Sequence, residues 1–353
     1  MMRPVLCTLF DSRYLDKGIL LYQSLEKCCP EFRLYVLAMD DRCYDVLNDL
    51  GYHFLIPIRL SSFENEQLLI AKANRSFGEY CWTCSSSLIQ YVLHRFNEPF
   101  CAYVDADMYF YKDPAVLFDE LGAENKSVLI VGHRFNRFSK INENIIGRYC
   151  VEFNLFKNEK NALSLLQTWI NQCLECCSKR FDGIHYGDQK YLDNWVENYP
   201  FVMETQNMGA GIAPWNIRQY KLKSITDRRV FLRFSSQIVE LVFYHFENIS
   251  FLSSDLVNIH VFNSWGIDSS LVKYLYNDYL TQIKSTQEYL AKEFDIEFGV
   301  FSHPEIISDF NYSARLKNMI YRLKQKGGLL YILFNRIPSL LQKKKNLFNL
   351  ASK

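Results

Sequence analysis

Two aspartates one residue apart, Asp105 and Asp107, stand at the end of an apolar run and constrain the chain more than any other feature. Ala102 to Val104 predict a buried strand, and the residues after them alternate too weakly to continue it. Side chains at positions i and i+2 of an extended segment point the same way, so both carboxylates can converge on one hard cation. A solvated turn is the alternative for such a pair. The apolar lead-in and the aromatic exit from Tyr109 to Pro114 favour a metal site.

The segment before this pair alternates between strand and helix patterns. Strands are predicted at 4–10, 33–39 and 54–58, with helices at 15–28 and 44–50 between them, and polar residues follow the strands. This order is typical of a parallel nucleotide-binding sheet, whose ligands bind at the carboxyl ends of the strands. The sequence contains no Gly-x-Gly-x-x-Gly or Walker motif, which excludes a motif-based assignment to dinucleotide or P-loop folds.

The second half of the chain continues the α/β pattern. Helical periodicity covers 63–96 with a break expected at Gly78, strands are predicted at 127–131 and 149–156, and a helix at 161–177. The stretch 186–195 predicts the polar entry to another helix, for which Asp188 is a candidate N-cap. A glycine-punctuated loop at 206–216 precedes a predicted hairpin of strands 228–234 and 237–245.

Cysteine usage bears on compartment and on metal binding. The chain has 11 Cys and begins without an apolar leader segment, which favours a reducing compartment over secretion. The Cys81–Cys84 pair and the cluster Cys173, Cys176 and Cys177 have spacings that suit metal binding or redox chemistry. Such spacings also arise by chance in a Cys-rich helix, and that interpretation is favoured for both.

Four stretches in order, "YVDADMYF" (103–110), "GDQKYLDNW" (187–195), "GAGIAPWN" (209–216) and "FYHFEN" (243–248), resemble the GT-A glycosyltransferases. The closest similarity is to the bacterial family 8 type, which includes lipooligosaccharide galactosyltransferases, and it covers roughly residues 4–250. It implies the GT-A fold, a Rossmann-like mixed sheet with flanking helices and an Asp-x-Asp pair at a strand end. No one of these motifs is decisive, but their order is specific.

The resemblance implies a metal and a nucleotide-sugar donor. Asp105, Asp107 and His245 match the residues that bind Mn²⁺, which bridges the diphosphate of a UDP-sugar. Mg²⁺ remains an alternative ion. Taken alone, His245 would favour a packed histidine at the end of an apolar strand. The positions that match uracil and ribose contacts follow the first strand, and Asp11 among them can equally cap the next helix; these positions are Thr8, Phe10, Asp11 and Tyr14.

The resemblance also places Asp188 and Gln189 near the anomeric carbon. An amide has no useful pKa, so Gln189 cannot act as a general base and the two-carboxylate hydrolase scheme does not fit. The implied reaction retains configuration: the departing phosphate takes the acceptor proton, Gln189 stabilises the oxocarbenium-like centre and Asp188 holds sugar hydroxyls.

The segment that lines the donor sugar departs from the family pattern. An Asn-x-Gly-like sequence is expected there, whereas this chain has Tyr149 to Asn154, so that Glu152, or Asn154 in a shifted register, takes its place. Gly209, Gly211 and Trp215 are further predicted contacts of the sugar or acceptor, with the two glycines permitting close backbone approach. This departure leaves the donor sugar open.

The C-terminal segment differs from the rest in charge. Ten of the 40 Lys and Arg lie from Asn311 onward with no Asp or Glu among them. Residues 313–326 predict a basic amphipathic helix, and the apolar run 329–341 is too short for a membrane span. The segment 312–353 is therefore predicted to bind an anionic membrane surface. Packing of this segment on the domain is the alternative, and nucleic acid is disfavoured because aliphatic residues alternate with the basic ones.

These observations combine into one expected organisation and function. Residues 1–265 form a GT-A catalytic domain, with the nucleotide-sugar bound by about 1–115 and the acceptor side in about 127–250, followed by a helical extension at 266–311. The expected enzyme is a metal-dependent glycosyltransferase that moves a sugar from a UDP-sugar to a glycan or lipid-linked acceptor. The resemblance implies bacterial surface polysaccharide synthesis at the cytoplasmic face of the inner membrane. A metal-dependent nucleotidyltransferase and a catalytically idle glycan-binding relative are the alternatives.

Overall fold

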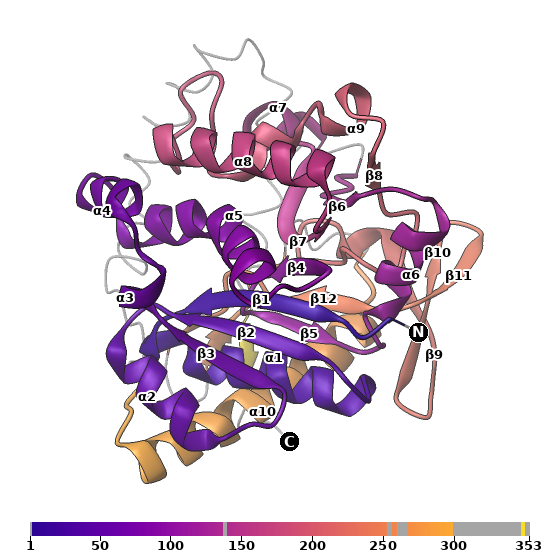
Figure 1. Cartoon of the computed structure of the whole chain (residues 1–353). Helices are drawn as coiled ribbons and strands as arrows, with labels where there is room; N and C mark the ends of the chain where they lie inside the picture. The colour runs from indigo at the N-terminus through magenta and orange to yellow at the C-terminus, as the bar shows by residue number, and fades with distance from the viewer. Residues whose placement is uncertain are drawn as a thin grey trace, which may run out of the picture.

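Seven strands form one mixed sheet in the order β3-β2-β1-β4-β7-β6-β8 in the computed structural model (Figure 1). The structure describes residues 2–136, 140–252, 256–259, 261, 267–298 and 347–349. Strand β7 runs antiparallel to β4 and β6, and the other neighbouring pairs are parallel. The strands are β1 Val5–Phe10, β2 Arg33–Ala38, β3 Leu55–Arg59, β4 Phe100–Val104, β6 Val128–Gly132, β7 Tyr149–Lys157 and β8 Val202–Glu204. The predicted α/β class and the mixed sheet are confirmed.

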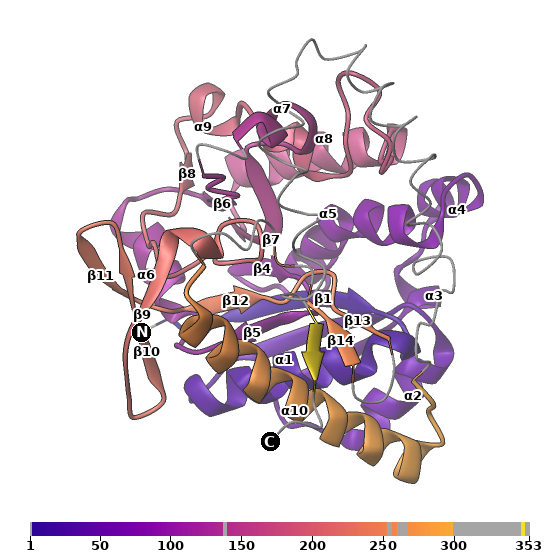
Figure 2. The same cartoon turned by 180° about the vertical axis from the view of Figure 1, so that it is seen from behind.

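Helices cover both faces of this sheet. Figure 1 shows α5 and α8 on one face, and Figure 2 shows α10 crossing α1 on the other. The α-helices are α1 Leu15–Cys28, α2 Asp41–Leu50, α3 Leu60–Phe63, α4 Glu66–Ala73, α5 Phe77–Arg95, α6 Ala115–Ala123, α7 Glu143–Ile146, α8 Lys160–Glu175, α9 Trp195–Asn198 and α10 Ser269–Phe294. Single 3-10 turns are η1 Ser12–Tyr14, η2 Lys140–Asn142, η3 Gln189–Leu192 and η4 Ile217–Gln219.

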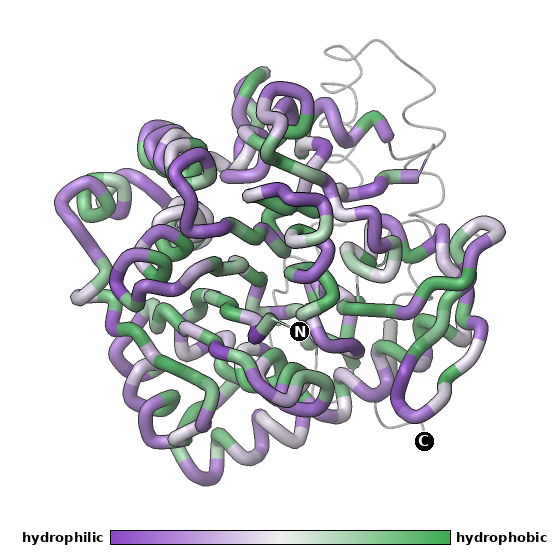
Figure 3. Tube along the Cα trace, turned by 45° about the vertical axis from the view of Figure 1, so that its right-hand side comes forward, coloured by the Kyte–Doolittle hydropathy of each residue, from purple (hydrophilic) through white to green (hydrophobic). Residues whose placement is uncertain are grey.

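The core has two layers because successive strand side chains point to opposite faces of the sheet. In β1, Leu6 and Phe10 pack with α1 and α2, whereas Cys7 and Leu9 pack with α5. All six residues of β1 are buried, which explains why this strand has an unbroken apolar sequence. Along the outer helices, hydrophilic and hydrophobic residues alternate (Figure 3). Each helix thus buries one stripe against the sheet.

The helical stretch 63–96 does not break at Gly78. Helix α4 ends at Ala73, and Ser76 caps α5 through reciprocal hydrogen bonds with Glu79. The break therefore lies at 74–76, and Gly78 sits in the first turn of α5. The capping box, a Ser followed three residues later by a Glu, is a sequence signal for this boundary that the helical periodicity did not include.

The predicted hairpin 228–245 contains an additional strand boundary. Strands β10 (Arg229–Phe234) and β11 (Gln237–Glu240) form a sheet with β9 (Tyr220–Thr226), but the chain then leaves it. Residues Phe243–His245 form β12, which pairs antiparallel with β5 (Met108–Phe110). The expected continuous strand to His245 is therefore wrong. The departure brings His245 beside the aspartate pair.

The helix predicted after 186–195 is also shorter than expected. Asp188 makes no side-chain capping hydrogen bond, and only the turn η3 and the four-residue helix α9 follow it. The capping role considered for Asp188 is thus contradicted. Its carboxylate is available for other contacts.

The C-terminal region is described only in part. Helix α10 falls within the predicted extension 266–311. The predicted basic helix 313–326 and the apolar run 329–341 lie outside the described residues. Three later residues, β15 (Leu347–Asn349), pair with β14 (Leu256–Asn258), which pairs in turn with β13 (Ser250–Phe251). Among the described helices, none combines the length and apolar character of a membrane span.

Candidate active site

A cavity of about 680 Å³ opens at the carboxyl edge of the sheet. Strands β1, β4 and β6 run in the same direction, so their ends lie at one edge and deliver Asp11, Asp105 and His133 to it. All three residues line the cavity. This is the place where open α/β sheets bind ligands.

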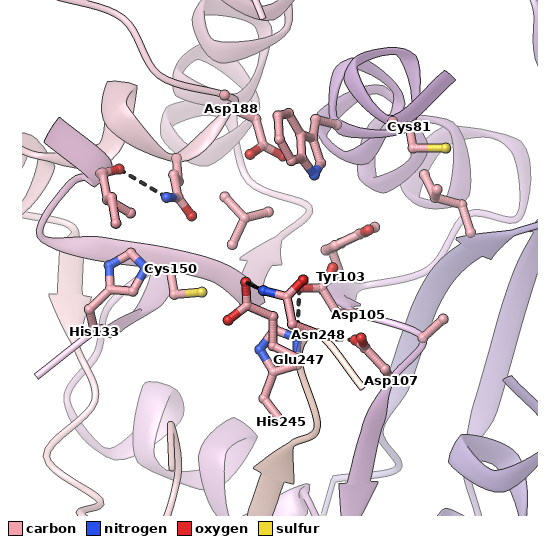
Figure 4. A pocket seen from close by; sticks show the side chains of 18 of the residues that line it. Cys81, Tyr103, Asp105, Asp107, His133, Cys150, Asp188, His245, Glu247 and Asn248 are labelled. Carbon is pink, nitrogen blue, oxygen red and sulfur yellow. Dashed lines mark hydrogen bonds and ion pairs between the residues drawn. The ribbon is translucent and has the colours of Figure 1, made fainter. Parts of the chain in front are cut away.

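Asp105, Asp107 and His245 converge on one wall of the cavity (Figure 4). The Nε2 atom of His245 lies 3.0 Å from Oδ1 of Asp107 and 3.7 Å from Oδ2 of Asp105. The backbone holds this geometry: the β5–β12 ladder pairs His245 with Met108, and the Phe246 N–H donates to the Asp107 carbonyl oxygen at 2.9 Å. The sequence prediction that these three residues come together is borne out by their positions.

Glu152 lies beneath His245 and is completely buried. Its Oε2 lies 2.8 Å from Nδ1 of His245, while no protein group among the described residues bonds its Oε1. Cys150, also buried, belongs to the same donor cluster. Cys150 lines the cavity together with Asp105, Asp107 and His245, whereas Glu152 does not reach it.

Burial and mutual charge perturb the pKa values in this cluster. Burial raises the pKa of Asp105 to about 6, although the neighbouring His245 charge opposes that rise. Burial also acts to raise the pKa of Asp107, but the charge and hydrogen bond of His245 outweigh it, and the pKa is lowered. For His245, burial is outweighed by Asp107, and the pKa lies well above its usual 6.5. The imidazolium thus holds two carboxylates together when no metal is bound.

The donor set fits a divalent cation. Two carboxylates and one imidazole supply the oxygen and nitrogen ligands that Mn²⁺ accepts, and the cavity leaves room for phosphate oxygens. Glu152 supplies the supporting contact that metal-binding histidines usually have, because an acceptor at Nδ1 directs Nε2 toward the ion. The three residues would therefore hold Mn²⁺ or Mg²⁺ on the cavity wall.

Asp188 and Gln189 occupy the cavity wall opposite Asp107 and His245 (Figure 4 labels Asp188). Asp188 Oδ2 accepts a hydrogen bond from Ser85 Oγ at 2.8 Å, and burial raises the Asp188 pKa to about 7. Gln189 also lines the cavity, and its Nε2 donates to the carbonyl oxygen of Ile146 at 2.9 Å. Both residues stand where a donor sugar would lie between them and the metal ligands.

The residues predicted to contact the nucleotide divide into two groups. Phe10, Asp11 and Tyr14 line the cavity, whereas Thr8 is buried inside β1 and does not. Asp11 also caps η1, accepting from the Arg13 N–H at 3.1 Å, and it pairs with the Arg13 guanidinium at 2.6 Å. The cap considered for Asp11 is thus present, and its predicted contact with the nucleotide stays a prediction.

Most of the residues predicted to contact the sugar do not line the cavity. Trp215 lines the cavity, with its Nε1 donating to the His133 carbonyl oxygen at 2.9 Å. Glu152 lies under His245, and Asn154 is buried within β7. Neither these two side chains nor the two glycines line the cavity. The role of Glu152 as a support for His245 replaces the predicted sugar contact.

Gly209 and Gly211 have packing reasons for lacking a side chain. A Cβ on Gly209 would lie 1.8 Å from the carbonyl oxygen of Glu240, and a Cβ on Gly211, which has φ of +75°, would lie 2.5 Å from Val131. The expected close backbone approach is confirmed. It serves the packing of the loop against β11 and β6, and a sugar contact by either glycine stays a prediction.

Several cavity residues escaped the sequence analysis. Most of them follow a strand or open a helix at the cavity edge, as His133 does after β6, whereas Tyr103 lies within β4 and Trp82 within α5. Burial lowers the His133 pKa to about 3 and raises the Glu247 pKa to about 7. The Arg13 guanidinium lies 5.0 Å above the ring of Phe77 at the cavity wall. The further residues are Arg13, Phe77, Trp82, Tyr103, His133, Phe135, Tyr186, Glu247 and Asn248.

Two curated relatives come from Bacillus subtilis (strain 168). The uncharacterized protein YfnD is 30% identical over 286 residues, covering 78% of this chain and 88% of YfnD. The uncharacterized protein YfnF is 29% identical over 301 residues, covering 83% of this chain and 97% of YfnF. No protein-family profile matches the sequence.

This chain is also distantly similar to a solved structure. The structure of the galactosyltransferase LgtC in complex with donor and acceptor sugar analogs has a TM-score of 0.49 and 14% identity. That match covers 80% of this chain and 95% of LgtC.

Proposed function

This chain belongs to the same family as YfnD of Bacillus subtilis, and from its site we propose that it is a metal-dependent glycosyltransferase. The donor we propose is a UDP-sugar, and the acceptor is a glycan or a lipid-linked oligosaccharide of a bacterial surface polysaccharide. We also propose that the transfer retains the configuration of the anomeric carbon. The proposal rests on the residues of this chain.

One observation carries the proposal. The candidate metal ligands Asp105, Asp107 and His245 and the pair Asp188 and Gln189 line a single cavity of about 680 Å³ from opposite sides. A volume within the range of small-molecule sites supports binding of a nucleotide-sugar between the two groups. The GT-A resemblance gives the same five residues, in the same order along the sequence.

The metal would supply Lewis-acid stabilisation of the negative charge that develops on the leaving diphosphate. The residues of this chain then have distinct tasks. Asp105 and Asp107 would supply carboxylate oxygens to the cation, and Glu152 orients His245. Arg13, which is held by Asp11 at the cavity wall, adds a positive charge near the nucleotide side.

Asp188 and Gln189 would act on the sugar. The Gln189 side chain is fixed by its hydrogen bond to Ile146, so its carbonyl oxygen can stabilise positive charge at the anomeric carbon without ionising. Asp188 can accept from or donate to sugar hydroxyls, because its pKa near 7 lets both protonation states occur at neutral pH. The acceptor proton would pass to the departing phosphate.

The test is calorimetric titration of UDP into the full chain with and without Mn²⁺, followed by a scan of UDP-sugars for hydrolysis. We expect UDP binding that depends on the metal and hydrolysis of one preferred UDP-sugar. The Asp105→Asn variant should lose the metal dependence while keeping its far-UV circular dichroism. Absence of UDP binding with every divalent metal would refute the proposal. Release of pyrophosphate from a nucleoside triphosphate would instead identify a nucleotidyltransferase.

We further propose that the chain works at the cytoplasmic face of the membrane through residues 312–353. The support is the charge of that segment, which holds ten Lys and Arg and no acidic residue from Asn311 onward. Each basic residue near an anionic leaflet contributes about 1 kcal/mol. Deleting 312–353 should release the protein from vesicles rich in phosphatidylglycerol, and unchanged co-sedimentation would refute this role.

A further inference from the structure

The segment between α8 and η3 carries a second group of metal-ligating side chains. Residues 176–188 form no helix or strand, and they end at the cavity residues Tyr186, Gly187 and Asp188. Within this segment, one ligand atom from each of Cys176, Asp182 and His185 lies within 4.8 Å of the other two. None of these three residues lines the cavity, so the cluster is separate from the candidate active site.

The three donors are held in place by contacts on both sides. Asp182 Oδ1 accepts from the backbone N–H groups of Ile184 and His185 at 2.8 and 2.7 Å, and its Oδ2 lies 2.8 Å from His185 Nδ1. These contacts hold the Asp182 carboxylate in one orientation beside the His185 ring. A ligand that is already oriented loses less conformational freedom when it binds an ion.

Tyr191 connects Cys176 to His185 from the other side. Its hydroxyl donates to the carbonyl oxygen of Cys176 at 2.6 Å, and its ring lies 5.6 Å from the imidazole of His185. Cys176 is the C-terminal cap of α8, whose hydrogen bond to the Gln172 carbonyl fixes the backbone there. Tyr191 thus contacts the Cys176 backbone and the His185 ring.

We propose that Cys176, Asp182 and His185 form a zinc site that fastens this segment to the end of α8. A thiolate, an imidazole and a carboxylate are ligand types of Zn²⁺, with bonds of about 2.0–2.3 Å, and three protein ligands leave the fourth tetrahedral position to water. Mn²⁺ and Mg²⁺ prefer oxygen ligands, so the thiolate directs this site toward a softer ion than the one at Asp105 and Asp107.

An ion bound at this place would also affect the candidate active site. His185 precedes Asp188 by three residues, and Gly183 and Gly187 between Asp182 and Asp188 have φ of +113° and +55°. Such positions allow the backbone to adopt many conformations when nothing holds it. A zinc ion at His185 would fix the start of the stretch that delivers Asp188 and Gln189 to the cavity.

The test is titration of the chelator-treated full chain with Co²⁺, because a thiolate bound to Co²⁺ gives a ligand-to-metal charge-transfer band. We expect one equivalent of Co²⁺ to produce this band in the wild-type protein and Zn²⁺ to abolish it by displacement. The Cys176→Ser variant should lose the band. The His185→Ala variant should weaken Zn²⁺ binding by at least about 10-fold, the effect expected even for lost supporting groups.

Two control variants make the result specific. Cys28 is a half-buried thiol that belongs to no donor cluster of the described residues, so Cys28→Ser should keep the band. Cys150 lies in the donor cluster with His245, and a band that persists in Cys150→Ser excludes cobalt bound there. Circular dichroism checks that each variant folds. No band in the wild type, a band retained in folded Cys176→Ser, or one lost in folded Cys150→Ser would overturn the proposal.

Discussion

The Nδ1 atom of His245 lies 2.8 Å from Oε2 of Glu152, and the Nε2 atom of the same ring lies 3.0 Å from Asp107. One imidazole thus joins a completely buried carboxylate to a carboxylate on the cavity wall. Because Glu152 accepts the Nδ1 proton, Nε2 is the nitrogen that faces the candidate metal position. The buried residue therefore decides how the cavity residue can act.

Removing the charge of Glu152 tests this relationship. We expect Glu152→Gln to weaken Mn²⁺ binding by about 10–100-fold, because the neutral amide makes His245 a poorer ligand. Calorimetry with Mn²⁺ in the presence of UDP measures the change. Glu31→Gln, at a mostly exposed carboxylate, is the matched control and should bind as the wild type does. Wild-type affinity in Glu152→Gln would show that the buried carboxylate does not support the metal.

Metal affinity should also depend on pH. The pKa of His245 lies well above 6.5, so a proton must leave the ring before the metal binds, and affinity should rise with pH through the neutral range. The pKa of Asp105 is about 6, so below pH 6 a second proton competes and affinity should fall more steeply. Titrations with Mn²⁺ between pH 5 and 8 measure this slope. An affinity independent of pH would contradict the protonation states assigned to both residues.

Ionisation of Asp188 should lower the stability of the fold as the pH rises toward and through neutrality. Its folded-state pKa of about 7 exceeds the unfolded value near 3.8, so the folded protein binds the extra proton between these values and stability falls as pH rises through that window. Asp188→Asn removes the ionisable group, and its Tm should exceed that of the wild type by about 2 °C or more at pH 8, and by less at pH 5. Thermal unfolding at the two pH values measures the difference. Equal Tm differences at both would show that Asp188 is not the titrating group.

Two glycines should respond in opposite directions to the same substitution. Gly209→Ala places a Cβ against the Glu240 carbonyl oxygen and should destabilise the protein by at least about 1–3 kcal/mol. Gly78→Ala adds a methyl group where no atom lies within 4 Å, and in helix α5 it should stabilise by about 0.5–1 kcal/mol. Denaturant unfolding compares both with the wild type. A neutral Gly209→Ala would show that the loop shifts easily away from β11.

Local sequence patterns predicted the parts of the fold that local chemistry determines. Helix α1 begins at Leu15 and ends at Cys28 as the periodicity indicated, and Asp105 and Asp107 follow β4 as expected. The partnership of Glu152 and His245 was not predictable in this way. It depends on β12 leaving the β9–β11 sheet to pair with β5, and that pairing joins segments about 135 residues apart. A strand pattern shows that a segment is extended but not which partner it chooses.

The same limit explains Thr8 and Gly209. An alternating or apolar pattern cannot tell which end of a strand reaches the cavity, so Thr8, inside β1, was predicted together with Asp11, which lies at its end. Similarly, a Gly-rich loop indicates close approach but not the approaching group, which for Gly209 is the backbone of Glu240. The burial of Thr8 and the group that Gly209 approaches are both decided by the three-dimensional arrangement of the chain.

The short β5–β12 ladder makes the site sensitive to chain length. An extra residue at the exposed turn Asp227 and Arg228 would lengthen only the β9–β10 hairpin. One extra residue between Glu240 and Phe243 would instead shift the pairing by one position and turn His245 to the opposite face of β12. Tyr244 would then occupy the position beside Asp107. Insertions that this protein tolerates should therefore accumulate at the first place and be absent from the second.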